Sequence, residues 1–144
     1  MFNINREPSH DLVEKLLHEN QLPTQDISRI DMGHFFGCGS AKEMHAVVGL
    51  EVHGEDGLLR SLVVSKSARN AGYATALVEH LEAHARSIGI NHLYLLTETA
   101  EAYFKNKGYL KITRDMASEP IKGTKQFSEL CPASAVVMRK NIAS

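Results

Sequence analysis

The feature that most constrains the fold is the junction at residues 62–74, where an apolar run passes through a short polar loop directly into an amphipathic helix. The first turn of a helix leaves backbone N–H groups unpaired, and the aligned peptide dipoles add about half a positive charge there. Arg69 stands just before this helix, while Gly72 and Ala74 keep side-chain bulk away from the backbone. The spacing Arg-x-x-Gly-x-Ala is therefore typical of a site that binds a pyrophosphate.

The helix after this junction is the clearest element of the sequence. Its apolar stripe comprises Ala74, Leu77, Val78, Leu81, Ala85 and Ile88, and its polar side carries Glu79, Glu82 and Arg86. Gly89 suits a C-terminal cap. Apolar runs at 58–64 and 92–97 flank the helix, so the segment predicts a strand, helix, strand crossover.

The other segments alternate between strand and helix patterns. Strands are predicted at 2–5, 34–38, 45–53, 109–113 and 135–139, and helices at 9–20, 24–30 and 99–107, the last capped by Thr99. Antiparallel pairs followed by a crossover predict an α/β (α+β) fold with a mixed, mostly antiparallel central sheet flanked by helices. The 144 residues are predicted to form a single domain over 1–144. Residues 114–134 read as a long connection with little periodicity, and such loops are often functional.

Composition excludes several classes of function. The formal net charge of -1 and the lack of a long basic run argue against binding to nucleic acid. No segment approaches the roughly 20 apolar residues that span a bilayer, so no membrane insertion is expected. Residues 1–6 lack the pattern of a secretory signal, which favours a cytoplasmic protein. Cys38 and Cys131 do not make a disulfide framework.

Two motifs in this order carry a resemblance to a known family. The first is Val64 with Arg69-x-x-Gly72-x-Ala74, and the second is Ala-Tyr-Phe-Lys-Asn-Lys-Gly-Tyr at 102–109. Together they resemble the acetyl-CoA-binding core of the GNAT N-acetyltransferases, over about residues 58–109. This resemblance implies a GNAT-like sheet with a splayed central strand pair. Residues 58–62 and 127–135 are similar to a GNAT subgroup associated with arsenic-resistance genes, a name that describes gene company and establishes no substrate.

The resemblance also implies a set of cofactor contacts. Acetyl-CoA would be the co-substrate, with no metal. The backbone at 62–64 would pair with the pantetheine arm, the amides of 70–75 would hold the pyrophosphate, and either Lys105 or Lys107 would reach the adenosine phosphate. The implied contacts are Leu62, Val63, Val64, Arg69, Asn70, Ala71, Gly72, Tyr73, Ala74, Thr75, Thr97, Ala102, Phe104 and Lys105. The N–H of Val64 would then donate to the thioester oxygen as negative charge develops there.

The transfer chemistry needs a way to remove a proton from the acceptor amine. Glu51, His53 and Glu98 are the candidates for this step, and Glu51 is preferred. The family's usual tyrosine proton donor is replaced here by Phe104. Tyr103 is adjacent, but one helical step turns a side chain by about 100°, so a packing tyrosine competes with the reading as a general acid.

Several other residues carry weaker signals. Arg60 and Ser61 are expected to line the acceptor notch from the central strand. Arg114 and Lys122 could recognise an anionic group on the acceptor, although ordinary exposed cations explain them equally well. His80 and His84 have a metal-compatible spacing, but a solvated helix face is favoured because no third ligand is evident. Cys131 is read as a structural cysteine.

Three functions remain open from the sequence. The preferred one is acetyl transfer from acetyl-CoA to a primary amine of a small molecule, amino-acid-like or arsenic-containing. The second is a non-catalytic acyl-CoA-binding regulatory module, which the replacement of tyrosine by Phe104 favours. The third, a nucleotide hydrolase, lacks the Gly-Lys-Ser/Thr that would hold a triphosphate. A homodimer is left open.

Overall fold

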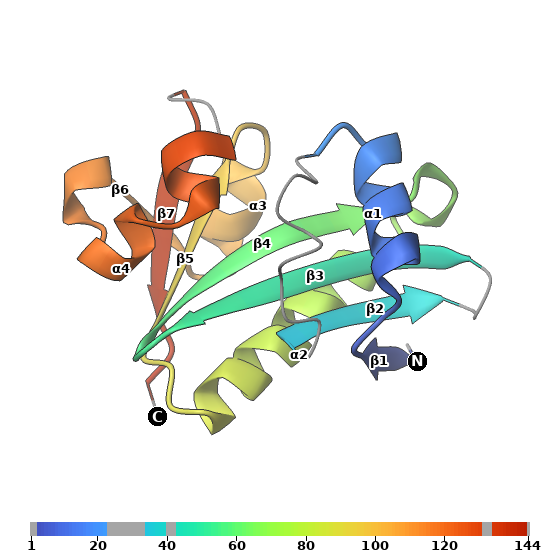
Figure 1. The fold of residues 1–144 in the computed structure, drawn as a ribbon, viewed down its shortest axis with the longest axis horizontal. Coiled ribbons are helices and arrows are strands. Elements are labelled where there is room, and N and C mark those ends of the chain that lie inside the picture. Colours follow the sequence, from blue (N-terminus) through green and yellow to red (C-terminus); the bar gives the residue numbers. More distant parts are fainter. Residues whose placement is uncertain (1–2, 23–33, 40–42, 131–133, 144) are drawn as a thin grey trace. The chain divides into compact units, whose positions relative to one another are not determined.

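The computed structural model describes residues 3–22, 34–39, 43–130 and 134–143 (Figure 1). Its strands are β1 (Ile4–Arg6), β2 (Phe35–Gly39), β3 (Met44–His53), β4 (Asp56–Val64), β5 (His92–Thr97), β6 (Leu110–Ile112) and β7 (Val136–Asn141). They form one seven-stranded sheet in the order β1-β2-β3-β4-β5-β7-β6. Strands β4 and β5 are parallel, and the sheet is otherwise mostly antiparallel, which confirms the predicted fold class.

The chain divides into two compact units. The first unit comprises Met1–Leu50 and Ser61–His84, and the second comprises Glu51–Arg60 and Ala85–Ser144. Strands β3 and β4 and the long helix α2 (Tyr73–Ser87) each contribute residues to both units. The predicted helix at 24–30 lies outside the described residues. Within the described part of the chain, no helix is both long enough and apolar enough to cross a bilayer.

The core of the first unit lies between helix α1 (His10–Glu19) and the sheet. Ser9 precedes this helix, and its carbonyl accepts a hydrogen bond from Val13 N at 3.0 Å. The buried core residues are Val13, Leu16, Leu17, Phe35, Val47 and Val63. Gly49 is required here because a Cβ at this position would lie only 2.4 Å from Cζ of Phe35. The helix predicted at 9–20 therefore forms, and it buries an apolar face.

At the C-terminal end of helix α2, the buried residues differ from those of the predicted apolar stripe. Ile88 is 43% exposed, whereas Glu82 is only 8% exposed. The helix ends at Ser87, and Gly89, with φ 89°, reverses the chain so that Ile90 N donates to Ala85 O at 3.0 Å. Ile90 is therefore buried in the core, whereas the sequence predicted that Ile88 would be the buried isoleucine.

Strand β4 leaves β5 soon after the two begin to pair. Their parallel ladder joins Asp56–Leu58 to His92–Tyr94, although β4 continues to Val64. Ser61 has a left-handed backbone, with φ 59°, and such a residue interrupts the regular pleat of a strand. The splayed central strand pair that the sequence resemblance implied is therefore confirmed.

The second unit corrects two expectations. Residues 114–130 form helical turns: η4 (Arg114–Met116), α4 (Glu119–Lys122) and a π-helical turn, η5 (Gln126–Leu130). We call this stretch the cover segment. It packs against the sheet because buried apolar residues recur along it, in a cluster of Leu58, Tyr94, Ala117, Ile121, Phe127 and Val137. The second correction concerns helix α3 (Glu101–Asn106), where Thr97 rather than Thr99 accepts a hydrogen bond, from Ala100 N at 2.9 Å.

Candidate functional site

The α2 entry loop, residues 65–72, joins β4 to α2 in the first unit. It contains a short 3-10 turn, η3 (Lys66–Ala68), followed by two left-handed residues, Asn70 with φ 66° and Gly72 with φ 87°. Left-handed residues set among ordinary ones turn backbone N–H groups toward one side, and such concave surfaces bind anions. The first helical hydrogen bond of α2 runs from Ala76 N to Gly72 O at 3.1 Å. The loop therefore leads into a helix start, the kind of backbone at which anionic ligands bind.

Three hydrogen bonds anchor the entry loop to the rest of the first unit. Ser65 N donates to His45 O at 2.7 Å, which continues the pairing of β3 beyond the end of β4. Arg69 donates from Nε to Val64 O at 3.2 Å and from Nη2 to Asn20 Oδ1 at 3.1 Å. The exposed Arg69 side chain therefore ties the loop to β4 and to the end of α1, as well as adding positive charge.

His45 lies at an irregularity where β3 starts. Cys38 pairs with Ala46 and Gly39 with Met44, so His45 is the extra residue of a bulge. Bulges turn a side chain away from its regular direction, and the ring of His45 lies 6.3 Å from the ring of Tyr73, the first residue of α2. Nδ1 of His45 is buried and has no hydrogen-bond partner among the described residues. A buried polar atom of this kind is costly unless a ligand or water pairs with it.

A groove of about 720 Å³ lies between α1 and the entry loop. Its lining residues are Leu12, Lys15, Leu16, Glu19, Asn20, Glu43, Met44, Ser65, Lys66 and Ser67. The lining thus combines apolar residues with charges of both signs. The groove has the size of a small-molecule site.

The residues of the first unit have the chemistry that coenzyme A requires. The entry loop supplies backbone donors, Arg69 and Lys66 supply positive charge, and His45 supplies a buried polar atom that no described residue pairs with. Leu62–Val64 form the end of β4, and Val63 is the buried member of this group. Tyr73, Ala74 and Thr75 form the first turn of α2, after Ala71 and Gly72 in the loop.

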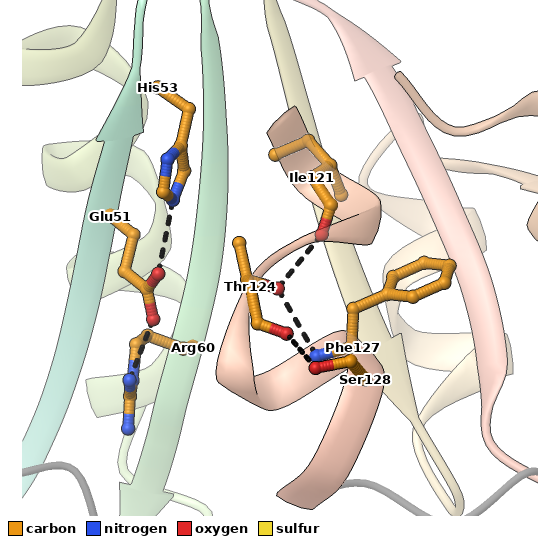
Figure 2. Close-up of polar contacts among 7 residues, drawn as sticks. All are labelled: Glu51, His53, Arg60, Ile121, Thr124, Phe127 and Ser128. Atoms are coloured by element: carbon orange, nitrogen blue, oxygen red, sulfur yellow. Dashed lines mark hydrogen bonds and ion pairs between the residues drawn. The ribbon is translucent and has the colours of Figure 1, made fainter. Parts of the chain in front are cut away.

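A polar row in the second unit comprises Glu51, His53 and Arg60 (Figure 2). Arg60 Nη1 donates to Glu51 Oε2 at 2.7 Å, and the other carboxylate oxygen, Oε1, lies 3.1 Å from His53 Nε2. The exposed fraction of these side chains rises from 1% at Arg60 through 14% at Glu51 to 29% at His53. The guanidinium is thus buried, whereas the imidazole reaches solvent. The structure therefore joins Glu51, a predicted catalytic residue, to Arg60, a predicted acceptor residue.

The cover segment is held together by the hydroxyl and the carbonyl of Thr124 (Figure 2). Thr124 Oγ1 donates to Ile121 O at 2.8 Å and accepts from Phe127 N at 3.2 Å. Ser128 Oγ donates to Thr124 O at 2.8 Å. Because Thr124 is only 5% exposed, these bonds form in a protected environment and fix the bend between α4 and η5.

The two predicted acceptor cations in the cover segment have different surroundings. The sequence predicts an exposed cation or an anion-binding group at Arg114, but its guanidinium lies 5.0 Å from the Phe127 ring centroid. Its Nη1 also donates to Phe127 O at 3.4 Å. Lys122 Nζ lies 3.5 Å from Glu119 Oε1, a surface ion pair. Arg114 therefore helps to stabilise the cover segment through its contacts with Phe127.

The remaining predicted contacts of the second unit lie on or near α3. Thr97 ends β5, and Ala102 and Lys105 are exposed on α3. Phe104 is 4% exposed, with its ring centroid 5.2 Å from that of Tyr103 and 5.4 Å from that of Tyr109. Phe104 is thus a core residue. Tyr103 is half-buried, and Lys107 Nζ lies 5.5 Å from its ring centroid. These surroundings match the alternative that Tyr103 is a packing residue.

Histidines of the first unit gather around Phe36. His34 Nδ1 lies 3.1 Å from His84 Nε2, and the rings of His80 and His84 meet Phe36 edge-on. Burial lowers the pKa of His84, and positive charge at Arg6, His34 and His80 lowers it further. The expected solvated face is therefore wrong for His84. Among the described residues, no group of three or more His, Cys, Asp or Glu side chains could hold a metal ion.

Three features of the site had no clear signal in the sequence. His45 is directed by a bulge, and a bulge depends on strand register, which the sequence does not show. The link between Glu51 and Arg60 depends on how β3 and β4 pair. Thr124 lay in a stretch that had no periodicity to interpret. Cys131 lies outside the described residues.

Comparison with curated proteins identifies relatives among amino-acid acetyltransferases. The chain is 28% identical over 101 residues to the "Amino-acid acetyltransferase" of Neisseria meningitidis serogroup A. The match covers 70% of this chain and 21% of that protein. The chain therefore spans about a fifth of the length of this relative.

Solved structures share the fold at low sequence identity. N-acetylglutamate synthase from Neisseria gonorrhoeae, complexed with coenzyme A and N-acetyl-glutamate, matches with a TM-score of 0.82 and 18% identity, over 100% of this chain and 36% of that chain. Rv2747 from Mycobacterium tuberculosis, in a complex that contains CoA, matches with a TM-score of 0.80 and 15% identity, over 96% of this chain and 98% of that chain. Both structures were thus solved with coenzyme A.

A family model covers most of the sequence. The model of the acetyltransferase (GNAT) family matches residues 3–110, which include both motifs that carried the resemblance. The splayed strand pair and the left-handed entry loop agree with this match. The chain therefore belongs to the acetyltransferase (GNAT) family.

Proposed function

We propose that this protein transfers an acetyl group from acetyl-CoA to the primary amine of a small, amino-acid-like molecule. The observation that carries the proposal is the entry loop, in which left-handed Asn70 and Gly72 lead into the first turn of α2. This backbone suits a diphosphate because its donors are fixed before the ligand arrives. Relatives named amino-acid acetyltransferases support the choice of acceptor.

In the first unit, we assign the coenzyme to backbone groups. The amides of residues 70–75 bind the diphosphate, Arg69 adds charge, and the backbone of residues 62–64 pairs with the pantetheine arm. The N–H of Val64 stabilises the negative charge that develops on the thioester oxygen. In the second unit, the assigned contacts are Thr97, Ala102, Phe104 and Lys105.

The reaction requires little acid catalysis from the protein. A thiol has a pKa of about 8.5, so the coenzyme thiolate leaves without a strong proton donor. This property explains how a chain with Phe104 in place of the usual tyrosine could retain activity. Positioning of the amine and removal of its proton are then the main tasks of the side chains, and we assign the proton to Glu51. Tyr103 remains a secondary candidate as proton donor.

The acceptor is assigned to the polar face of the second unit. Glu51 and Arg60 place opposite charges side by side, as the ammonium and carboxylate of an amino acid also do. Ser61, Arg114 and Lys122 are the further predicted acceptor contacts. The Neisseria gonorrhoeae synthase was solved in complex with N-acetyl-glutamate, which supports a carboxylate-bearing acceptor.

A thiol-release assay tests the proposed activity. Purified protein with acetyl-CoA is challenged with L-glutamate, L-glutamine, L-ornithine, L-phenylalanine and an arsenic-containing amine. Turnover of at least one α-amino acid is expected. Saturable binding of coenzyme A without release on any amine would contradict catalysis and favour the acyl-CoA-binding module. Turnover of the arsenic compound alone would favour the subgroup that residues 58–62 and 127–135 resemble.

Some properties remain predictions within this proposal. We propose that the two units act together as one GNAT domain over residues 1–144. We also propose a cytoplasmic protein that acts on small molecules and binds neither nucleic acid nor membranes. Light scattering of the purified protein distinguishes a monomer from the homodimer that the sequence left open.

A further inference from the structure

We propose that Glu51 and His53 form a proton relay, in which Glu51 takes a proton from the acceptor ammonium and His53 delivers it to solvent. The inference rests on the proposed acetyltransferase function and deepens it. The geometry carries the assignment: one carboxylate oxygen of Glu51 is held by Arg60 at 2.7 Å, and the other lies 3.1 Å from His53 Nε2. The carboxylate thus has one oxygen fixed and one in contact with a second titratable group.

The strand geometry explains why these two groups lie close together. Glu51 and His53 are two positions apart on β3, and alternate side chains of a strand point to the same face. Their side chains therefore follow each other along one face (Figure 2). Arg60 reaches the same carboxylate from β4. This single hydrogen bond holds Oε2, while Oε1 of the same carboxylate lies beside His53.

Burial gives the relay a direction. The exposed fraction of the side chain is 1% at Arg60, 14% at Glu51 and 29% at His53. A proton on Glu51 is shielded from water, whereas a proton on His53 can pass to bulk solvent. Imidazole suits the outer position because it both accepts and donates a proton near neutral pH.

The inner end of this row lies on the same face of β4 as Leu58, a residue that packs against the cover segment. Leu58 and Arg60 are two positions apart on β4, so their side chains lie on the same face of the strand. Leu58 packs in a cluster with Ile121 and Phe127. The segment is fixed by the Thr124 hydrogen bonds, so it provides a rigid wall rather than a loose loop. Because the Arg60 side chain is only 1% exposed, water has little direct access to the inner end, and a route through His53 becomes useful.

The proton balance of the reaction is complete. An N–H bond of the acceptor ammonium breaks, and its proton passes through Glu51 Oε1 to His53 Nε2. The resulting imidazolium releases a proton to solvent. The neutral amine then forms the C–N bond to the acetyl carbon, the C–S bond breaks, and the second amine proton goes to the coenzyme thiolate. No additional reactant is required.

Replacement of His53 tests the relay through chemical rescue. The variant His53→Gln keeps a hydrogen-bonding side chain but removes the titratable group. Its kcat in dilute buffer, with the amino acid that wild type acetylates best, is expected to fall by about tenfold or more. Addition of free imidazole should restore the rate in a saturable manner, because a small buffer replaces the missing proton carrier. KM for acetyl-CoA should not change.

A matched control is available in the same unit. His92 Nδ1 lies 4.0 Å from Asp56 Oδ1, so His92 is also a partly exposed histidine beside a carboxylate. The variant His92→Gln should keep the wild-type kcat and should show no response to imidazole. A rescue that was equal in both variants would overturn the relay, because it would show a general buffer effect.

Failure of the relay and failure of the proposed function give different results. If wild type binds coenzyme A but acetylates none of the amines, the function itself fails. If wild type is active and His53→Gln matches it in dilute buffer, only the relay fails. If His53→Gln is slow, folded by circular dichroism and insensitive to imidazole, His53 has a structural role and the relay is also overturned.

Discussion

The two units arrange their polar groups in different ways. The first unit uses the backbone: Asn70 and Gly72 adopt left-handed conformations, and both residues are exposed. The second unit uses side chains, and the guanidinium of Arg60 is buried against Glu51. The first arrangement depends on φ angles and tolerates changes of side chain, whereas the second depends on charge pairing that is costly to break. Substitutions should therefore affect the two units in different ways.

The largest effect is expected for Arg60→Leu. Removal of the guanidinium leaves the carboxylate of Glu51 without its closest partner in a largely buried position. The free energy of unfolding should fall by about 3–5 kcal/mol. Urea denaturation of wild type and variant measures this loss.

The double variant Arg60→Leu with Glu51→Leu sharpens this test. If the unpaired charge causes the destabilisation, the double variant should be more stable than Arg60→Leu alone, because no buried charge remains. A double variant that is less stable than either single variant would show that packing, and not charge pairing, dominates in the second unit.

Gly49→Ala tests the first unit, where close packing should matter more than charge. The new Cβ would lie 2.4 Å from the ring of Phe35, which is fully buried. Displacement of this ring should cost about 1–3 kcal/mol in the free energy of unfolding. The second change Phe35→Leu, added to Gly49→Ala, should recover part of that loss. Equal stability of wild type and Gly49→Ala would contradict the close contact.

Thr124→Val examines the wall of the second unit. Valine keeps the shape of threonine but removes the hydroxyl that bonds to Ile121 O and Phe127 N. A loss of about 1–2 kcal/mol in unfolding free energy is expected because these buried backbone groups lose their partner. Ser128→Ala removes a bond to the Thr124 carbonyl on the exposed side and should cost less. The reverse order of the two effects would argue against a rigid cover segment.

The smallest expected effect is a dependence of stability on pH in the first unit. Burial lowers the pKa of His84 below the ordinary value of 6.5, so the unfolded chain binds this proton more readily. The stability that neutral His84 contributes is present above about pH 6.5 and is lost as the pH falls through the folded pKa. Urea midpoints measured across this range should fall less steeply with acid for His84→Gln than for wild type. Parallel curves for the two proteins would refute the assignment.

The contrast between the units also explains what the sequence could predict. The entry loop is encoded in one contiguous motif, because its geometry depends on Gly72 and on the helix that follows. The strands and the long helix follow from local periodicity in the same way. The end of α2 was misplaced because the cap at Gly89, and not the stripe, decides which isoleucine is buried.

Features that depend on strand pairing could not be predicted from the sequence. Glu51 and Arg60 are nine positions apart, and only the pairing of β3 with β4 makes them partners. His45 is directed by a register shift that no local pattern indicates. The cover segment appeared irregular because it consists of short turns whose apolar residues match no single period. Glu51, Arg60 and the cover segment belong to the proposed acceptor site, so the sequence did not reveal how the parts of that site are paired and packed.

Calorimetric titration with coenzyme A tests the central claim, that the backbone at the start of α2 binds the coenzyme. The comparison uses two glycines with nearly equal left-handed φ, Gly72 at 87° and Gly89 at 89°. Wild type should bind with saturation, Gly89→Leu should bind equally well, and Gly72→Leu should bind at least about tenfold more weakly, because it disturbs charge-assisted backbone hydrogen bonds. Absence of saturable heat with folded wild type, or equal affinity in Gly72→Leu, would contradict the account.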